Sequence, residues 1–264
     1  TGEGVVTITK SVPGWQNVRP IGEDIAAGEM LLPSHHTIRP VDIGVLLAGG
    51  ILNLEIFKKP KVSIIPTGTE IIMPHENPKE GDIIDSNSGM FAAMVTESGG
   101  VPHRCSIVPD DYQKIKETVL QETERSDMVI INAGSSAGTE DYTVHVLREI
   151  GQVIVHGVAM KPGKPVILAI VQGKSVIGLP GYPVSAYLAF ENFAEPVLRI
   201  MAGLSPNKGS STRKTVKAVL SKRTVSSLKH REYVRVKVGK VGDKFVCAPL
   251  ARGAYSKRDV LIRI

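Results

Sequence analysis

The sequence predicts an α/β protein: a largely parallel sheet in three layers, preceded by an N-terminal segment and followed by a small β domain. Three observations support this prediction. Apolar runs alternate with amphipathic stretches across residues 57–205, which is typical of βαβ units. Residues 1–56 contain short apolar runs broken by Pro and Gly, and residues 206–264 contain only short alternating runs.

The N-terminal segment is expected to contain one helix over residues 40–54. Pro40 stands at its first position, where the missing N–H removes no hydrogen bond, and a Gly-Gly pair follows the apolar stretch.

The central part is expected to hold strands of about six residues separated by helices. Aspartates open the helix at residue 110, which suits its positive end, and Pro196 is expected to kink the last helix. The expected strands are 61–68, 103–108, 127–134, 152–158, 166–172 and 175–181, and the expected helices are 86–100, 110–126, 141–151 and 183–204.

After a linker near residue 205, four short strands are expected to form a separate β domain. They cover residues 215–225, 231–239, 244–251 and 259–264.

Composition narrows the class of function. The apolar fraction of 42% and the charged fraction of 22% are those of an ordinary globular protein, and neither a membrane span nor a signal peptide is visible. Cys105 and Cys247 show no CxxC or Cys–His spacing, so we expect no zinc site or disulfide, and a reducing cytoplasm. The net charge of +6 leaves two interpretations open, a solvated basic face or an anionic small substrate. With 5% aromatics and no recognition motif, nucleic acid is not expected as a partner.

Three strand exits carry unusual residues: PTGTE at 66–70, NAGSSAGTEDY at 132–142 and LPGYPVS at 179–185. Ligands bind at the carboxyl ends of the strands in open parallel sheets. We therefore expect the three loops to lie side by side around a ligand.

The middle loop has small residues suited to a phosphate. Gly134 and Gly138 bracket Ser135 and Ser136, so that backbone N–H groups can approach an anion. The loop is neither a Walker loop nor GxGxxG, and a flexible turn remains an alternative. Asp141 either serves the site or caps the following helix.

The third loop, LPGYPVS, begins the last helix of the sheet domain. Pro183 stands near the first helical position and Ser185 in the first turn, an anion-binding geometry that an ordinary capped helix start would share. Pro180 and Gly181 complete this candidate binding loop.

Carboxylates complete the predicted pocket. Glu70 follows Gly68 in the first loop, and Asp85 begins DSNS, so that Ser86 and Asn87 join the candidate binding residues. Asp85 could instead be only a helix cap. Carboxylates beside phosphates suggest a bound divalent cation, and magnesium is the usual one; its predicted ligands are Glu70, Asp85 and Asp141.

Two lysines, Lys161 and Lys164, lie in KPGKP before the strand at residue 166. The prolines restrict the backbone beside each lysine, so less entropy is lost when the ammonium groups meet an anion. The pair suits a phosphate or another tetrahedral oxyanion, and solvated loop lysines are the alternative.

These motifs resemble one family. GTEDY, HGVAMKPGKP and GLPGYPVSAYLAF, in this order, are similar to the molybdopterin molybdenumtransferases, which include the E domain of gephyrin. VRPIGEDIAAGEMLLP, PTGTEI, GDIIDSNSGM and REYVRVKV also resemble family segments. Thr69 stands where the family usually has an acid, and Tyr182 stands where it has Asn. The resemblance implies that the chain is N-terminally truncated, with residues 1–56 a remnant of a longer region.

The resemblance implies an enzyme that inserts molybdenum from molybdate into adenylylated molybdopterin and releases AMP. It implies that Asp24 lies near the active site, that Lys161 and Lys164 receive the oxyanion, and that Glu70, Asp85 and Asp141 hold Mg²⁺ or position the substrate. Gly181, Pro183 and Ser185 would shape the pocket wall. It further implies a homodimer and an adenylyltransferase partner. The alternatives are an adenylyltransferase itself, insertion of tungsten, and a scaffold role of the same fold.

Overall fold

Six strands form the central sheet of the second of two compact units, Thr1–Ile56 and Phe57–Ile264. The computed structural model describes residues 4–133, 142–206, 216–223 and 229–250. Of the six strands, β8 runs antiparallel to both neighbours and the others share one direction, so the predicted largely parallel sheet is confirmed. The spatial order is β4 (Val101–Arg104), β1 (Lys61–Pro66), β5 (Met128–Ala133), β9 (Lys174–Pro180), β8 (Ile167–Val171) and β6 (Gln152–His156).

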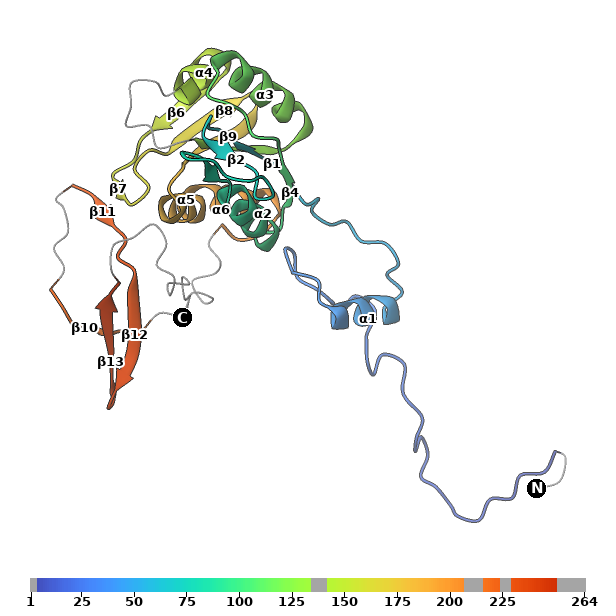
Figure 1. Cartoon of the computed structure of the whole chain (residues 1–264). Coiled ribbons are helices and arrows are strands. Elements are labelled where there is room, and N and C mark those ends of the chain that lie inside the picture. The colour runs from blue at the N-terminus through green and yellow to red at the C-terminus, as the bar shows by residue number, and fades with distance from the viewer. Residues whose placement is uncertain (1–3, 134–141, 207–215, 224–228, 251–264) are drawn as a thin grey trace. The chain divides into compact units, whose positions relative to one another are not determined.

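Helices cover both faces of this sheet (Figure 1). Successive strand residues point to opposite faces, and in β1 Ile64 packs in one core while Ile65 packs in the other. Helices α2 (Asn87–Glu97), α5 (Pro183–Ala189) and α6 (Glu195–Met201) cover the first face, and α3 (Tyr112–Arg125) and α4 (Tyr142–Ile150) cover the second. The three-layer prediction is therefore confirmed.

The last helix is interrupted where the sequence indicated a kink. A π-helical turn, Phe190–Ala194, separates α5 from α6, and the N–H of Glu195 donates to the carbonyl of Phe190. Pro196 has no N–H to donate and its ring crowds the preceding turn, so the wider turn accommodates it.

The edge strand β4 differs from its prediction. It spans Val101–Arg104 rather than 103–108. Its parallel register with β1 ends at Ile64↔Arg104, after which the chain rejoins β1 at one bridge between Val108 and Thr67. An edge strand has only one partner, so it ends where that register is lost.

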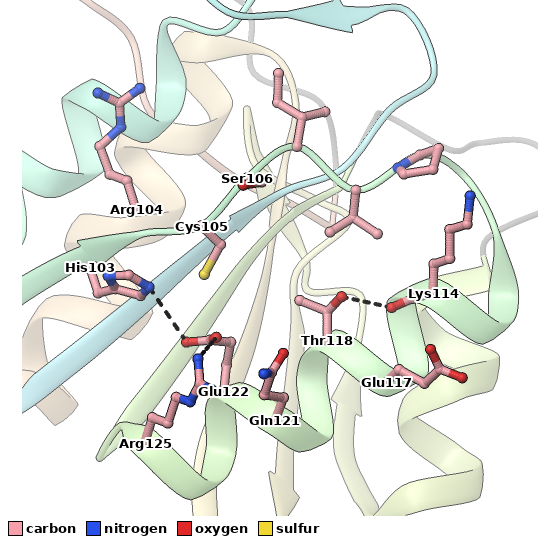
Figure 2. A pocket seen from close by; sticks show the side chains of 13 residues that line it. His103, Arg104, Cys105, Ser106, Lys114, Glu117, Thr118, Gln121, Glu122 and Arg125 are labelled. Carbon is pink, nitrogen blue, oxygen red and sulfur yellow. Dashed lines mark hydrogen bonds and ion pairs between the residues drawn. The ribbon is translucent and has the colours of Figure 1, made fainter.

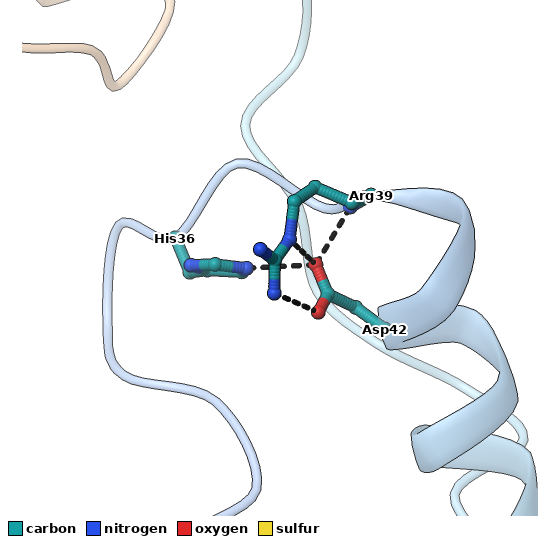
Figure 3. A network of polar contacts seen from close by, with 3 residues as sticks. All are labelled: His36, Arg39 and Asp42. Atoms are coloured by element: carbon teal, nitrogen blue, oxygen red, sulfur yellow. Dashed lines mark hydrogen bonds and ion pairs between the residues drawn. The ribbon is translucent and has the colours of Figure 1, made fainter.

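The first unit contains helix α1 (Pro40–Ala48), which begins as predicted but ends six residues earlier, because Gly49 and Gly50 close it. Gly50 has a φ of 76°, and the N–H of Ile51 donates to the carbonyl of Leu46, which satisfies a terminal carbonyl. At the other end, Asp42 accepts from Arg39 and lies 2.7 Å from His36 Nε2 (Figure 3).

Smaller sheets complete the second unit. The first two-stranded sheet pairs β2 (Ile71–Ile72) with β3 (Ile83–Ile84), and the second pairs β7 (Met160–Lys161) with β11 (Arg231–Glu232). The predicted small C-terminal sheet is present, in the order β10 (Val219–Leu220), β13 (Lys244–Pro249) and β12 (Val236–Val241). The single strand predicted over 231–239 is thus divided between two sheets. Among the described residues, no helix has the length and apolar character needed to span a bilayer.

Candidate functional site

The carboxyl ends of β1, β5 and β9 lie side by side, as predicted. These strands are parallel neighbours, with Pro66 opposite Asn132 and Ala133 opposite Pro180. The loops that follow them therefore leave the sheet at one edge.

Asn87 connects the ends of β5 and β9 through one side-chain amide. Its Nδ2 donates to the Oδ1 of Asn132 at 3.2 Å and to the carbonyl of Gly181 at 2.6 Å. The side chain is 6% exposed, and its own Oδ1 has no hydrogen-bond partner among the described residues. Buried polar atoms are normally paired, so this oxygen is a candidate to accept a hydrogen bond from a ligand.

Asp85 lies two residues before Asn87, just ahead of α2, and is also buried. Its Oδ1 accepts from the backbone N–H of Ser88 at 3.0 Å, and its Oδ2 accepts from the Ser88 hydroxyl. Arg104 donates to that hydroxyl at 2.9 Å and holds its Nη2 3.7 Å from the carboxylate. The capping contact that the sequence left open is therefore made, and the metal-binding role stays a prediction.

Glu70 is exposed, and its segment is tied to that of Asp85. The N–H of Ile83 donates to the carbonyl of Glu70 at 2.8 Å, and the N–H of Asp85 donates to that of Ile72 at 2.9 Å. Gly68 begins the loop at a φ of 147°, and a Cβ there would lie 2.5 Å from Ile71. Glycine is therefore required for this turn.

The KPGKP loop reaches the same edge of the sheet, since β6 ends and β8 begins there. Gly163 is buried, and a Cβ at this position would lie 2.4 Å from the Met160 methyl and 3.5 Å from the Ser185 carbonyl. The loop therefore packs against the first turn of α5. Lys161 and Lys164 are both exposed.

The C-terminal segment holds the other side of this loop. The N–H of Arg231 donates to Ala159 at 2.8 Å, and that of Tyr233 donates to Lys161 at 2.9 Å. The Tyr233 hydroxyl also donates to Asn192 in the π-helical turn. The backbone beside Lys161 is thus fixed by residues about 70 positions away in the sequence.

The start of α5 supplies the third loop. Pro180 is buried, Pro183 is the first helical residue, and Ser185 is half-buried in the first turn. Tyr182 is 62% exposed and precedes the helix without a capping hydrogen bond from its side chain. Ser86 is the residue before α2 and is exposed.

Some predicted site residues are not joined to this cluster. Asp24 belongs to the first unit, where it forms an ion pair with Arg19 on the surface. Gly134, Ser135, Ser136, Gly138 and Asp141 lie outside the described residues.

Four residues that the structure places here had no predicted role: Thr67, Ser88, Arg104 and Asn132. The Thr67 hydroxyl donates to the carbonyl of Asn132 at 3.1 Å, so the two strand exits are also joined directly. Asn132 could have been selected, because it is a polar residue at the end of an apolar strand. Arg104 gave no such signal, since its role depends on a partner 19 residues away.

Comparisons with known proteins agree with this arrangement. Residues 63–200 match the family described as "Probable molybdopterin binding domain", and residues 1–50 match the MoeA N-terminal region, domains I and II. A protein of Methanocaldococcus jannaschii named for molybdopterin biosynthesis is 33% identical over 241 residues, covering 88% of this chain and 57% of that protein. A molybdopterin molybdenumtransferase of Nostoc is 32% identical over 205 residues, covering 76% and 47%.

A solved structure shows the same fold. The molybdopterin biosynthesis MoeA protein of a Pyrococcus species has a TM-score of 0.73 and 32% identity, covering 89% of this chain and 56% of that one. The chain therefore spans about half the length of these relatives.

Proposed function

The chain belongs to the molybdopterin molybdenumtransferase family, and on this premise we propose that it inserts molybdenum into molybdopterin during molybdenum cofactor biosynthesis. The proposed substrates are adenylylated molybdopterin and molybdate, and the proposed products are the metal-loaded cofactor and AMP. The observation that carries the proposal is that the ends of β1, β5 and β9 lie side by side, with Asn87 joining two of them, beside a loop with two exposed lysines.

The proposed substrate carries a negatively charged pyrophosphate, which suits the two lysines at the edge of the sheet where β1, β5 and β9 end. Lys161 and Lys164 supply two cations from a loop that is packed against α5 and paired with β11. Because this backbone is held on both sides, less entropy is lost when the ammonium groups bind an oxyanion. In this proposal they hold phosphate and molybdate oxygens, and they stabilise negative charge that develops as the pyrophosphate bond breaks.

Asn87 and the carboxylates orient the rest of the substrate in this proposal. The Oδ1 of Asn87, which has no hydrogen-bond partner in the described part of the chain, is an acceptor for an N–H or O–H group of the pterin nucleotide. Gly181, Pro183 and Ser185, at the start of α5, form the adjacent wall of the proposed pocket. Asp85 holds the start of α2 in place through its hydrogen bond from the N–H of Ser88.

Magnesium is proposed as the divalent cation. Mg²⁺ is usually bound by one or two carboxylates together with substrate phosphates and water. Exposed Glu70 fits this requirement. Asp85 would have to exchange its Ser88 hydroxyl for the ion, and Asp141 is the third proposed ligand. When bound, the ion would neutralise phosphate charge.

We also propose a homodimer in the cytoplasm that receives its substrate from an adenylyltransferase partner. Large apolar side chains exposed in the first unit, among them Val6, Ile8 and Trp15, support an assembly that covers them. The family name favours molybdenum over tungsten as the inserted metal.

The test is release of AMP from adenylylated molybdopterin, measured by chromatography, with and without molybdate and Mg²⁺. We expect release to require both. Asp141→Asn should abolish it without lowering the melting temperature, because an amide still caps a helix but carries no charge. Lys161→Ala should have a milder effect, since Lys164 remains, and Lys244→Ala, an exposed lysine on β13, should have none.

Two outcomes would contradict the proposal. If Asp141→Asn melts normally and turns over at the wild-type rate, Asp141 is only a helix cap. If the folded protein instead consumes ATP to adenylylate molybdopterin, it is an adenylyltransferase.

A further inference from the structure

A polar pocket of about 480 Å³ lies between the edge strand β4 and helix α3 (Figure 2). His103 in β4 and Cys105, the residue after β4, both bring their side chains close to Glu122 of α3. Arg104, between them, reaches Asp85 on the other side. The inner part of this pocket is therefore distinct from the site at the strand ends.

Three potential metal ligands meet in this pocket. The ligand atoms of His103, Cys105 and Glu122 all lie within 4.8 Å of one another. In Figure 2 the Cys105 sulfur points toward the carboxylate of Glu122, beside the His103 ring. Burial and then Glu122 raise the pKa of the Cys105 thiol to about 12. A coordinating metal deprotonates such a thiol.

The Glu122 carboxylate is the least expected member of the cluster, because it is 4% exposed. The hydroxyl of Ser63, which is fully buried, donates to its Oε2 at 2.6 Å, and Ser126 lies 2.6 Å from the same hydroxyl. The two nitrogen-bearing side chains that face it are farther away: His103 Nε2 lies at 3.9 Å and Arg125 Nη1 at 3.8 Å. These distances are too long for hydrogen bonds. Among the described residues, this buried carboxylate is thus oriented by the Ser63 hydroxyl and has no closely bonded counter-charge, although burying a charge normally requires one.

We propose that His103, Cys105 and Glu122 bind a divalent transition metal of the zinc class. Zinc takes nitrogen, sulfur and carboxylate oxygen ligands in tetrahedral sites, and three protein ligands leave one position for water. The Ser63 hydroxyl would then orient the Glu122 carboxylate toward the metal through its hydrogen bond, without binding the metal itself. Arg125 is 62% exposed at its side chain and can turn to solvent as the ion replaces it.

The three atoms need only a small adjustment to reach a metal. Tetrahedral bonds of about 2.0–2.3 Å place ligand atoms roughly 3.3–3.8 Å apart. The His103 side chain is 60% exposed, so its ring can rotate inward. Ligand spacings along the chain predicted no zinc site, because neither cysteine has a CxxC or Cys–His spacing. Here the pair is His-x-Cys, and the third ligand comes from a helix.

The experiment titrates the metal-free chain with Co²⁺, which replaces zinc in such sites and absorbs light when bound by a thiolate. We expect one equivalent of Co²⁺ to give a thiolate-to-cobalt charge-transfer band, which Zn²⁺ then removes because it binds more tightly. Cys105→Ala should abolish the band. His103→Gln and Glu122→Gln should weaken binding by more than the roughly 10- to 100-fold that loss of an outer partner causes.

Matched controls use the other described cysteine and a histidine outside the cluster, as Cys247→Ala and His156→Gln, which should bind normally. The proposal is overturned if the band persists in Cys105→Ala, if it is lost in Cys247→Ala, or if neither Co²⁺ nor Zn²⁺ binds saturably at micromolar concentration. His103 is on the surface, so its variant will fold even where Glu122→Gln does not, and normal binding by His103→Gln also overturns the site. AMP release should be unchanged in Cys105→Ala, which separates this proposal from the proposed function.

Discussion

At the scale of single residues, Asn87 joins the ends of two strands at the candidate site. One NH₂ group serves two acceptors that lie 45 and 94 positions away in the sequence. Asn87→Ala should therefore take the donor from one buried and one half-buried acceptor and lower the free energy of unfolding by about 1–3 kcal/mol. Urea denaturation measures this change, and activity should fall with it because the strand exits lose their common donor.

Asn77→Ala is the matched control, since Asn77 is exposed in the same unit. Its effect should stay within about 0.5 kcal/mol. Equal stability of the two variants would show that the amide bridge is unimportant.

At the scale of elements, the KPGKP loop depends on one glycine. Gly163 has a φ of 108°, and an added Cβ would meet the Met160 methyl at 2.4 Å. Gly163→Ala should lower the free energy of unfolding by about 1–3 kcal/mol, because a side chain strains this backbone conformation. It should also weaken oxyanion binding by displacing Lys161 and Lys164.

For Gly89→Ala we expect the opposite effect, an increase in the free energy of unfolding. Gly89 lies in α2 with nothing within 4 Å of an added Cβ, so alanine should stabilise the helix by about 0.5–1 kcal/mol. Thermal or urea unfolding of the two variants gives the comparison, and a gain in stability for Gly163→Ala would contradict the packing described above.

Helix α1 should lose stability in acid through the network in Figure 3. The hydrogen bonds from Arg39, its side chain first, hold the pKa of Asp42 well below its usual range, while burial opposes them. A lowered folded-state pKa stabilises the fold fully above the unfolded pKa of about 4, and this contribution is lost as the pH falls below that value. NMR signals of the α1 amides, followed from neutral to acidic pH, should report the loss.

Asp42→Asn should remove most of that pH dependence, because the amide does not titrate. Glu55→Gln, an exposed acid in the same unit, is the control and should leave the profile as it is in the wild type. If the pH dependence of the α1 amide signals is unchanged in Asp42→Asn, groups other than Asp42 cause the acid transition.

At the scale of the whole molecule, we expect a homodimer. Light scattering at micromolar concentration should give about twice the chain mass of 28.4 kDa. Replacing Trp15, which is 83% exposed, by Ser should shift the equilibrium toward the monomer, because less apolar area is buried on association. Val241→Ser, at 67% exposure in the C-terminal sheet, is the control. A monomeric wild type, or equal masses for both variants, would contradict an interface through the first unit.

The sequence alone determined the layered α/β fold, because strand and helix periods are local properties. The start of α1 at Pro40 and the cap of α3 at Asp111 follow from the residues themselves, whereas the end of α1 was predicted six residues too late. The adjacency of the three strand exits was also predictable, since parallel strands end at one edge.

Only the tertiary structure decided which distant groups meet. The pairing of β11 with β7, the two acceptors of Asn87 and the approach of Glu122 to Cys105 join segments that are far apart in the chain. A repeating pattern tells which face a side chain occupies but not which partner lies opposite, because the partner is selected by packing across the whole sheet. For the same reason His103 and Cys105 could be read as surface residues of an edge strand until helix α3 placed a carboxylate beside them.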